Sequence, residues 1–225
     1  MSPRRIDPQL AGSLIEAAAR LLAEEGTAGL TTRRLATAVG TSTTAVYTHF
    51  GSMENLVRAL VHEGFARLQR RMALVRATAD PVADIMALGA AYRANALDHP
   101  QLYVVMFGSA ALGGFALDNG DRQHGRYTLE PLLAAVSRAV DRGRFRAADP
   151  LFTAQNMWIA LHGLVMLELG GYLIEPYNAD ACFDGQLRSL AVGAGDSYEA
   201  ATASLGRARR RGHPRPARAR ATAEK

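Results

Sequence analysis

The chain has 225 residues and a net charge of +5, and 48% of its residues are hydrophobic, which excludes a fibrous or wholly disordered protein. Its single cysteine, Cys182, excludes an intramolecular disulfide and a cysteine-rich zinc site. No apolar run reaches the roughly 18 residues that a membrane span needs, so we expect a cytoplasmic protein without a membrane-spanning segment.

Helical spacing runs through the first 80 residues, where no proline occurs between Pro8 and Pro81. Apolar residues recur three or four positions apart, and glycines at 26, 40 and 51 supply stops. Hydroxyl side chains before the second, third and fourth segments are typical N-caps. The pattern predicts helices at 8–25, 31–39, 41–50 and 52–75.

After Pro81 the prolines lie at or near the ends of apolar helical segments. We expect helices at 81–97, 101–111, 121–142, 150–173 and 179–205, the last interrupted near Gly193 and Gly195, and a glycine-rich loop at 108–120. No sustained alternation of apolar and polar residues predicts a strand. The predicted fold class is all-α, with about nine helices.

Charge divides the chain into three unequal blocks. Residues 1–76 carry ten arginines and six acids (net +4), residues 77–206 carry eight arginines and fourteen acids (net −6), and residues 207–225 have a net charge of +7. A basic block beside an acidic one suggests that one part of the protein meets a polyanion. From Gly206 on there is no apolar face, which predicts a disordered basic tail. This tail either adds nonspecific affinity for DNA or is incidental.

Two short predicted helices, joined by Gly40-Thr41-Ser42, have the arrangement of a helix-turn-helix. A major groove about 12 Å wide accepts one α-helix whose outward side chains are short. Val46 and Phe50 lie four apart and should face the core. Threonines offer a hydroxyl and a methyl group to bases, while tyrosine and histidine can hydrogen-bond phosphates. The expected outer arc contains no acid and consists of Thr43, Thr44, Ala45, Tyr47, Thr48 and His49.

These residues resemble the tetracycline-repressor-type (TetR-type) transcriptional regulators over about residues 8–70. The resemblance lies in Leu30-Thr31-Thr32-Arg33-Arg34-Leu35-Ala36, Gly40-Thr41-Ser42, Val46-Tyr47-Thr48-His49-Phe50 and Ser52-Met53-Glu54-Asn55-Leu56. It implies a DNA-binding domain in which Thr32 and Arg33 contact phosphates and Tyr47 and His49 clamp the DNA backbone. By the same resemblance the base readers are Thr43, Thr44, Ala45 and Thr48. Met53 stands where the family usually has lysine, so one phosphate contact is missing.

A second, weaker resemblance rests on the spacing of Trp158, His162 and Gly163, and is to a Trp-His-Gly-type C-terminal domain of some TetR-type proteins. It implies a ligand-binding and dimerisation domain at 80–205, whose last two long helices pair with those of a second copy in a four-helix bundle. A homodimer would bind an inverted-repeat operator. The candidate lining of a pocket for an apolar effector is Tyr92, Tyr103, Met106, Phe107, Trp158, His162 and Met166. Ordinary core packing is the alternative for each of these residues.

No pattern typical of an enzyme occurs in the sequence. The six histidines form no pair at metal-ligand spacing, and the residues after Asp118 lack the further ligands of a calcium loop. Gly193-Ala194-Gly195 follows no strand and lacks the third glycine of a dinucleotide site. We therefore predict that the protein is not an enzyme and has neither a metal site nor a cofactor.

Together these features predict a sequence-specific DNA-binding transcriptional regulator. In the favoured interpretation it is a homodimeric repressor, released from double-stranded DNA by a small apolar effector. Two alternatives stay open: a DNA-binding protein without an effector, constitutive or architectural, and an all-α protein-interaction module. The predicted organisation is a DNA-binding domain at 8–70, an effector and dimerisation domain at 80–205 and the tail at 206–225.

Overall fold

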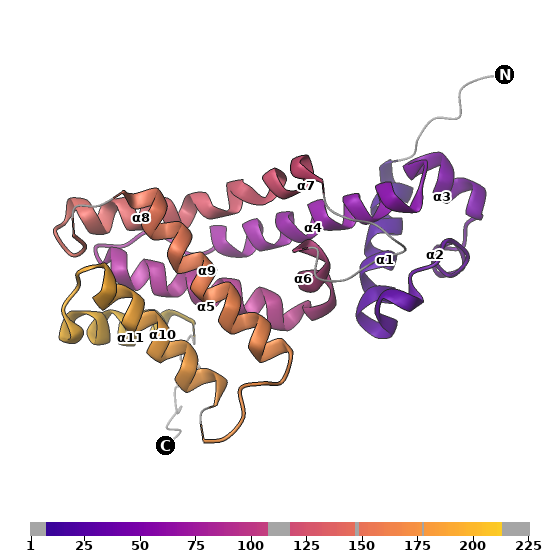
Figure 1. The fold of residues 1–225 in the computed structure, drawn as a ribbon. Helices are drawn as coiled ribbons and strands as arrows, with labels where there is room; N and C mark the ends of the chain where they lie inside the picture. Colours follow the sequence, from indigo (N-terminus) through magenta and orange to yellow (C-terminus); the bar gives the residue numbers. More distant parts are fainter. Residues whose placement is uncertain (1–7, 108–117, 147–148, 177, 213–225) are drawn as a thin grey trace, which may run out of the picture. The chain divides into compact units, whose positions relative to one another are not determined.

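The structure is a computed structural model, and it describes residues 8–107, 118–146, 149–176 and 178–212 (Figure 1). These residues form helices without any strand, which confirms the all-α prediction. None of the described helices is long and apolar enough to cross a membrane. The helices are α1 (Pro8–Gly29), α2 (Thr32–Val39), α3 (Thr43–Phe50), α4 (Met53–Ala73), α5 (Pro81–Asp98), α6 (Pro100–Met106), α7 (Asn119–His124), the 3-10 helix η1 (Gly125–Leu129), α8 (Glu130–Asp141), α9 (Pro150–Leu169), α10 (Ala179–Ala194) and α11 (Tyr198–Gly212).

Several helix ends differ from the prediction for identifiable reasons. The helix expected at 121–142 is divided into α7, η1 and α8, and a Cβ at Gly125 would lie only 2.4 Å from the ring of Phe65. Glycine therefore lets η1 approach α4 closely. The break between α10 and α11 is at Gly195, which has a φ of 121°, whereas Gly193 is helical. α7 begins at Asn119, inside the predicted loop at 108–120, and the rest of that loop lies largely outside the described residues.

The chain divides into two compact units. The first consists of residues 1–74 and 91–131, and the second of residues 75–90 and 132–225, so the boundary falls within α5. This grouping places α6, α7 and η1 with the N-terminal helices. The domains predicted from the sequence at 8–70 and 80–205 remain a prediction.

Helix α4 supports the helix-turn-helix segment within the first unit. It contacts α1, α3 and α6, and α1 also contacts α2 and α6. Its apolar stripe, which includes Leu56, Leu60 and Leu68, is buried as the spacing predicted. α6 lies so close to α4 that a Cβ at Gly64 would be 2.5 Å from the Met106 sulfur. Helix α4 therefore packs against both α3 and α6.

In the second unit, the buried carboxylate of Asp84 helps to hold the C-terminal helix. Asp84 is 2% exposed and accepts hydrogen bonds from Thr78, Arg138 (2.9 Å) and Arg211 (2.7 Å). Burial alone would raise the pKa of Asp84, but the hydrogen bonds from Thr78, Arg211 and Arg138 outweigh it and hold that pKa below its ordinary value.

The prediction of disorder from Gly206 is wrong for residues 206–212, which are helical in α11. Arg207 pairs with Asp80 at 2.6 Å, Arg211 pairs with Asp84, and Ala208 is buried. These acidic partners lie more than 120 residues earlier in the chain, so local composition could not indicate them. Residues 213–225 of the predicted tail lie outside the described residues.

We expect Asp84→Asn to lower the free energy of unfolding by about 2 kcal/mol at neutral pH, because it leaves two arginines without their carboxylate. A carboxylate whose pKa is lower in the folded than in the unfolded protein stabilises the fold at pH values above its unfolded-state pKa. This contribution is lost as the pH falls through its folded-state pKa. Urea unfolding should therefore show the difference from wild type shrinking as the pH falls below about 4. Asp141→Asn, at an exposed position, is the control. An equal effect of both variants would contradict the assigned role of Asp84.

Candidate nucleic-acid interface

Caps and a left-handed glycine fix the turn between α2 and α3. The Thr31 hydroxyl oxygen accepts from the Arg34 amide at the start of α2, and Gly40 ends that helix with a φ of 70°. The Ser42 side chain then accepts from the Ala45 amide at 3.1 Å and starts α3. These local hydrogen bonds set the direction of α3 relative to α2. Each of them was visible in the sequence as a residue type at a cap position.

The predicted outer arc of α3 is narrower in the structure. Thr43, Thr44 and Thr48 are exposed, and Tyr47 is 49% exposed. Ala45 and His49 are half-buried, as is Phe50, which had been expected to face the core. Val46 is buried, as expected. The three threonines and the tyrosine therefore form one exposed face of α3.

Only part of the His49 ring can contact the DNA backbone, because the side chain is half-buried. Its Nδ1 is buried and has no hydrogen-bond partner among the described residues. This leaves Nε2 as the ring nitrogen for a phosphate contact. Met53, at the position where TetR-type proteins usually have lysine, is half-buried as the first residue of α4.

The N-terminal end of α2 adds polar groups next to the exposed face of α3. The Thr32 hydroxyl lies 3.5 Å from the Tyr47 hydroxyl, so the two predicted phosphate contacts adjoin each other. Arg33 is exposed, and its guanidinium makes no ion pair with any residue that the structure describes. Arg34 instead forms a two-pronged ion pair with Glu25 of α1. Of the two adjacent arginines, Arg33 is thus the one free to meet a phosphate.

If this face binds DNA, we expect Arg33→Ala to reduce the salt dependence of that binding, because each bound copy of the chain would release one counterion fewer. The slope of log affinity against log salt should fall by about one for each bound copy, and the affinity by roughly tenfold. The matched control is Glu25→Gln combined with Arg34→Gln, which removes a whole ion pair and leaves the net charge unchanged. Fluorescence anisotropy at several salt concentrations measures both variants. A larger loss of slope in the control would assign the phosphate contact to Arg34.

The seven candidate effector residues fall into two sets, one in each unit. In the first unit Tyr92 and Tyr103 are buried, and their hydroxyls are hydrogen-bonded at 2.7 Å. Phe107 packs edge-on against Tyr103 at 5.0 Å, and Met106 is buried beside it on α6. Burial and the neighbouring Tyr92 raise the pKa of Tyr103 above its usual range, so its phenol is neutral.

The other three candidates are half-buried on α9 in the second unit. The rings of Trp158 and His162 lie 5.8 Å apart, and Met166 is one turn further along the helix. Burial lowers the pKa of His162, which keeps its imidazole neutral near pH 7.

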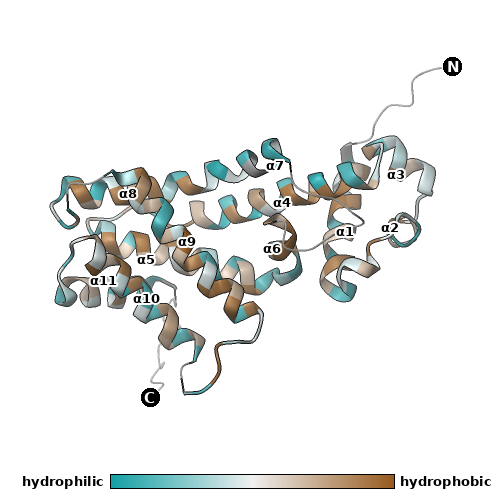
Figure 2. Cartoon of the chain, in the orientation of Figure 1, coloured by the Kyte–Doolittle hydropathy of each residue, from teal (hydrophilic) through white to brown (hydrophobic). Residues whose placement is uncertain are grey.

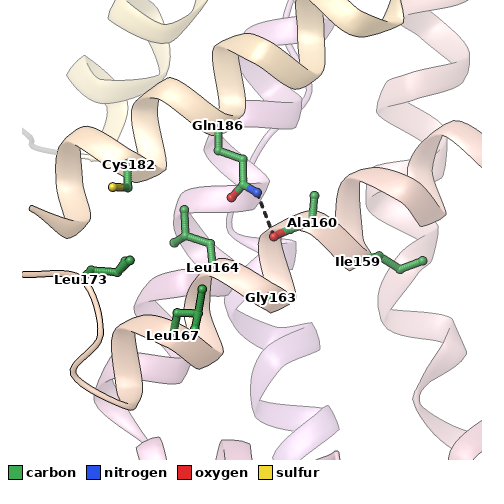
Figure 3. A pocket seen from close by; sticks show the side chains of 8 residues that line it. All are labelled: Ile159, Ala160, Gly163, Leu164, Leu167, Leu173, Cys182 and Gln186. Atoms are coloured by element: carbon green, nitrogen blue, oxygen red, sulfur yellow. Dashed lines mark hydrogen bonds between the residues drawn. The ribbon is translucent and has the colours of Figure 1, made fainter. Parts of the chain in front are cut away.

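An open pocket of about 490 Å³ lies between α9 and α10, and sequence reasoning missed it (Figure 3). Its lining is Ile159, Ala160, Gly163, Leu164, Leu167, Leu173, Cys182 and Gln186. None of the seven candidate effector residues is among them. The Gln186 side chain donates to the Ala160 carbonyl at 3.0 Å, while its Oε1 is buried without a partner among the described residues. The available signal was the nearly continuous apolar character of α9, which Figure 2 shows as mostly brown.

The described residues include no group of three or more metal-ligating side chains that could hold a metal ion. The polar side chains on the exposed face of α2 and α3 are those of threonine, tyrosine and arginine. These groups can hydrogen-bond bases and phosphates.

Comparison with known proteins agrees with this interpretation. Residues 14–60 match the family described as "Bacterial regulatory proteins, tetR family", and residues 85–190 match "Tetracyclin repressor-like, C-terminal domain". An uncharacterized HTH-type transcriptional regulator of Mycobacterium tuberculosis is 32% identical over 184 residues, which is 80% of this chain and 79% of the relative. The chain belongs to the TetR family.

Two further similarities differ in how much of the chain they cover. The HTH-type transcriptional repressor AcnR of Corynebacterium glutamicum is 47% identical over 55 residues, or 24% of this chain and 29% of the repressor. A crystal structure of a protein of unknown function from Rhodococcus sp. RHA1 matches with a TM-score of 0.71 and 26% identity, covering 83% of this chain and 96% of that one. As a TetR-family member, the protein is a DNA-binding transcriptional regulator, and its relatives are named as regulators.

Proposed function

We propose that the protein is a repressor that binds an inverted-repeat operator as a homodimer and leaves it when a small apolar molecule binds. The observation that carries the DNA-binding part is the exposed, acid-free face of α2 and α3. Thr43, Thr44 and Thr48 reach bases in the major groove, while Arg33, Thr32 and Tyr47 contact phosphates. Ala45 and His49 contribute less, since both are half-buried. The repressor name of the relative AcnR, which matches 24% of this chain, supports repression.

The homodimer forms through the apolar faces of α9 and α10. Ile159 is 53% exposed and Leu167 is 49% exposed, and both line the pocket between these helices. Apolar side chains concentrated on one face are typical of a surface that a partner covers. A second copy of the same pair of helices would bury them symmetrically. The two recognition helices of such a dimer would read the two halves of an inverted repeat.

The effector site is built around the hydrogen-bonded pair of Tyr92 and Tyr103, with Met106 and Phe107 as apolar walls. A neutral phenol pair inside an apolar cluster suits an apolar or aromatic molecule that carries one polar group. α6, which carries Tyr103, contacts both α1 and α4. A ligand that separates the two tyrosines would displace α6 and thereby shift the helices that support α3. Trp158, His162 and Met166, in the second unit, form a separate candidate site for the same kind of ligand.

Operator release in the presence of a panel of small aromatic and aliphatic molecules tests this proposal. We expect a compound that raises the melting temperature of the protein also to dissociate the operator complex. Tyr92→Phe combined with Tyr103→Phe should lower the affinity for that compound by about tenfold, because the hydroxyl groups that hydrogen-bond its polar group are lost. Tyr198→Phe, at an exposed position on α11, is the control. A releasing compound that binds the double variant as tightly as wild type would place the effector site elsewhere.

A further inference from the structure

The three threonines on the exposed face of α3 differ in what their hydroxyl groups are bonded to. The Thr48 hydroxyl donates to the Thr44 carbonyl at 2.8 Å, one helical turn earlier. The hydroxyls of Thr43 and Thr44 make no hydrogen bond with any residue that the structure describes. All three side chains are exposed.

This difference changes what each side chain offers to DNA. A hydroxyl has one proton, so the Thr48 hydroxyl cannot donate to a base while it donates to the Thr44 carbonyl. Its oxygen is directed toward the preceding turn of its own helix. The methyl group is the other branch of the Thr48 side chain. The hydroxyls of Thr43 and Thr44, in contrast, remain available to base edges or phosphates.

We propose that Thr48 recognises a thymine in each operator half-site through its methyl group, and that its hydroxyl donates no hydrogen bond to a base. The thymine C5-methyl group projects into the major groove and is the one apolar feature that distinguishes bases there. Contact between the two methyl groups removes both from water. This inference rests on the proposed binding of α3 in the major groove, and it adds one specified element of the operator.

Two substitutions at Thr48 separate the methyl group from the hydroxyl. Thr48→Val keeps a methyl group and removes the hydroxyl, whereas Thr48→Ser keeps the hydroxyl and removes the methyl group. Affinity is measured on the operator that the wild-type protein selects from random duplexes. We expect Thr48→Val to bind within about twofold of wild type and Thr48→Ser to bind about fourfold more weakly for each half-site.

Replacing operator thymines by uracil, one position of the half-site at a time, removes only the C5-methyl group. At one position the wild-type protein should lose about fourfold in affinity for each half-site. Thr48→Ser should be insensitive at that position, since its own methyl group is already absent, while Thr48→Val should respond as wild type does. The other thymines of the half-site are internal controls, because their replacement by uracil should change the affinity of the wild-type protein and of Thr48→Ser equally.

The outcomes distinguish this inference from the proposed function. If the wild-type protein selects an operator but Thr48→Val weakens binding and Thr48→Ser does not, the hydroxyl is the reader and the inference is wrong. It is equally wrong if no thymine position shows coupling to Thr48→Ser. If the wild-type protein selects no operator, the proposed function itself fails and the inference fails with it.

Discussion

Thr44→Glu is expected to lower the affinity of the protein for its proposed operator by at least about a thousandfold while leaving the fold intact. Thr44 is exposed on α3, so the substitution removes no core contact. A carboxylate at this position would face the DNA phosphates in both half-sites, and like charges placed together at an interface cost several kcal/mol. Fluorescence anisotropy with a labelled operator measures the loss, and far-UV circular dichroism checks the helix content.

Thr202→Glu is the matched control for this prediction. Thr202 is exposed on α11, and its hydroxyl donates to the carbonyl one turn earlier, as that of Thr48 does. The same change of charge there should alter operator affinity by less than about twofold. If Thr44→Glu binds the operator as well as wild type does, α3 does not enter the groove. The exposed face of α2 and α3 would then belong to a different partner.

Leu167→Asp is expected to convert the proposed homodimer into monomers at micromolar protein concentrations. Leu167 lines the pocket between α9 and α10 and is 49% exposed, so the isolated subunit tolerates the change. In the proposed dimer the new carboxylate would be buried without a partner, which costs several kcal/mol for each copy. Operator affinity should fall by more than about a hundredfold, because the two half-sites would be bound independently. Sedimentation velocity measures the assembly state.

The control for the dimer prediction is Leu74→Asp, because Leu74 is 80% exposed just after α4 and should not affect assembly. The single cysteine gives a second readout, since Cys182 lines the same pocket. A thiol reagent should react with Cys182 faster in Leu167→Asp than in the wild-type protein. A Leu167→Asp variant that remains dimeric would exclude the pocket face of α9 and α10 as the interface.

The helix-turn-helix could be predicted from the sequence because its signals are local. Thr31 and Ser42 cap α2 and α3 through their own neighbouring amides, and Gly40 adopts the left-handed conformation that ends α2. Each of these interactions spans at most four residues. The pairing of Arg34 with Glu25 spans nine residues and was not predicted, although it decides which arginine is free for DNA.

The C-terminal half was harder to predict because long-range contacts determine its details. The division of the expected helix at 121–142 depends on Phe65 of α4, which packs against Gly125. Residues 206–212 are helical although their composition suggests disorder, because Asp80 and Asp84 pair with Arg207 and Arg211. The pocket between α9 and α10 needs two helices in defined positions. No periodicity within one segment encodes such contacts.

Selection of bound sequences from a random duplex pool, by the purified full-length protein at about 150 mM salt, tests the central claim most directly. The predicted result is enrichment of an inverted repeat whose half-sites share a thymine, with binding that Thr44→Glu abolishes. Binding without enrichment that disappears as the salt concentration rises would show nonspecific electrostatic attraction only, and would contradict operator recognition by α3.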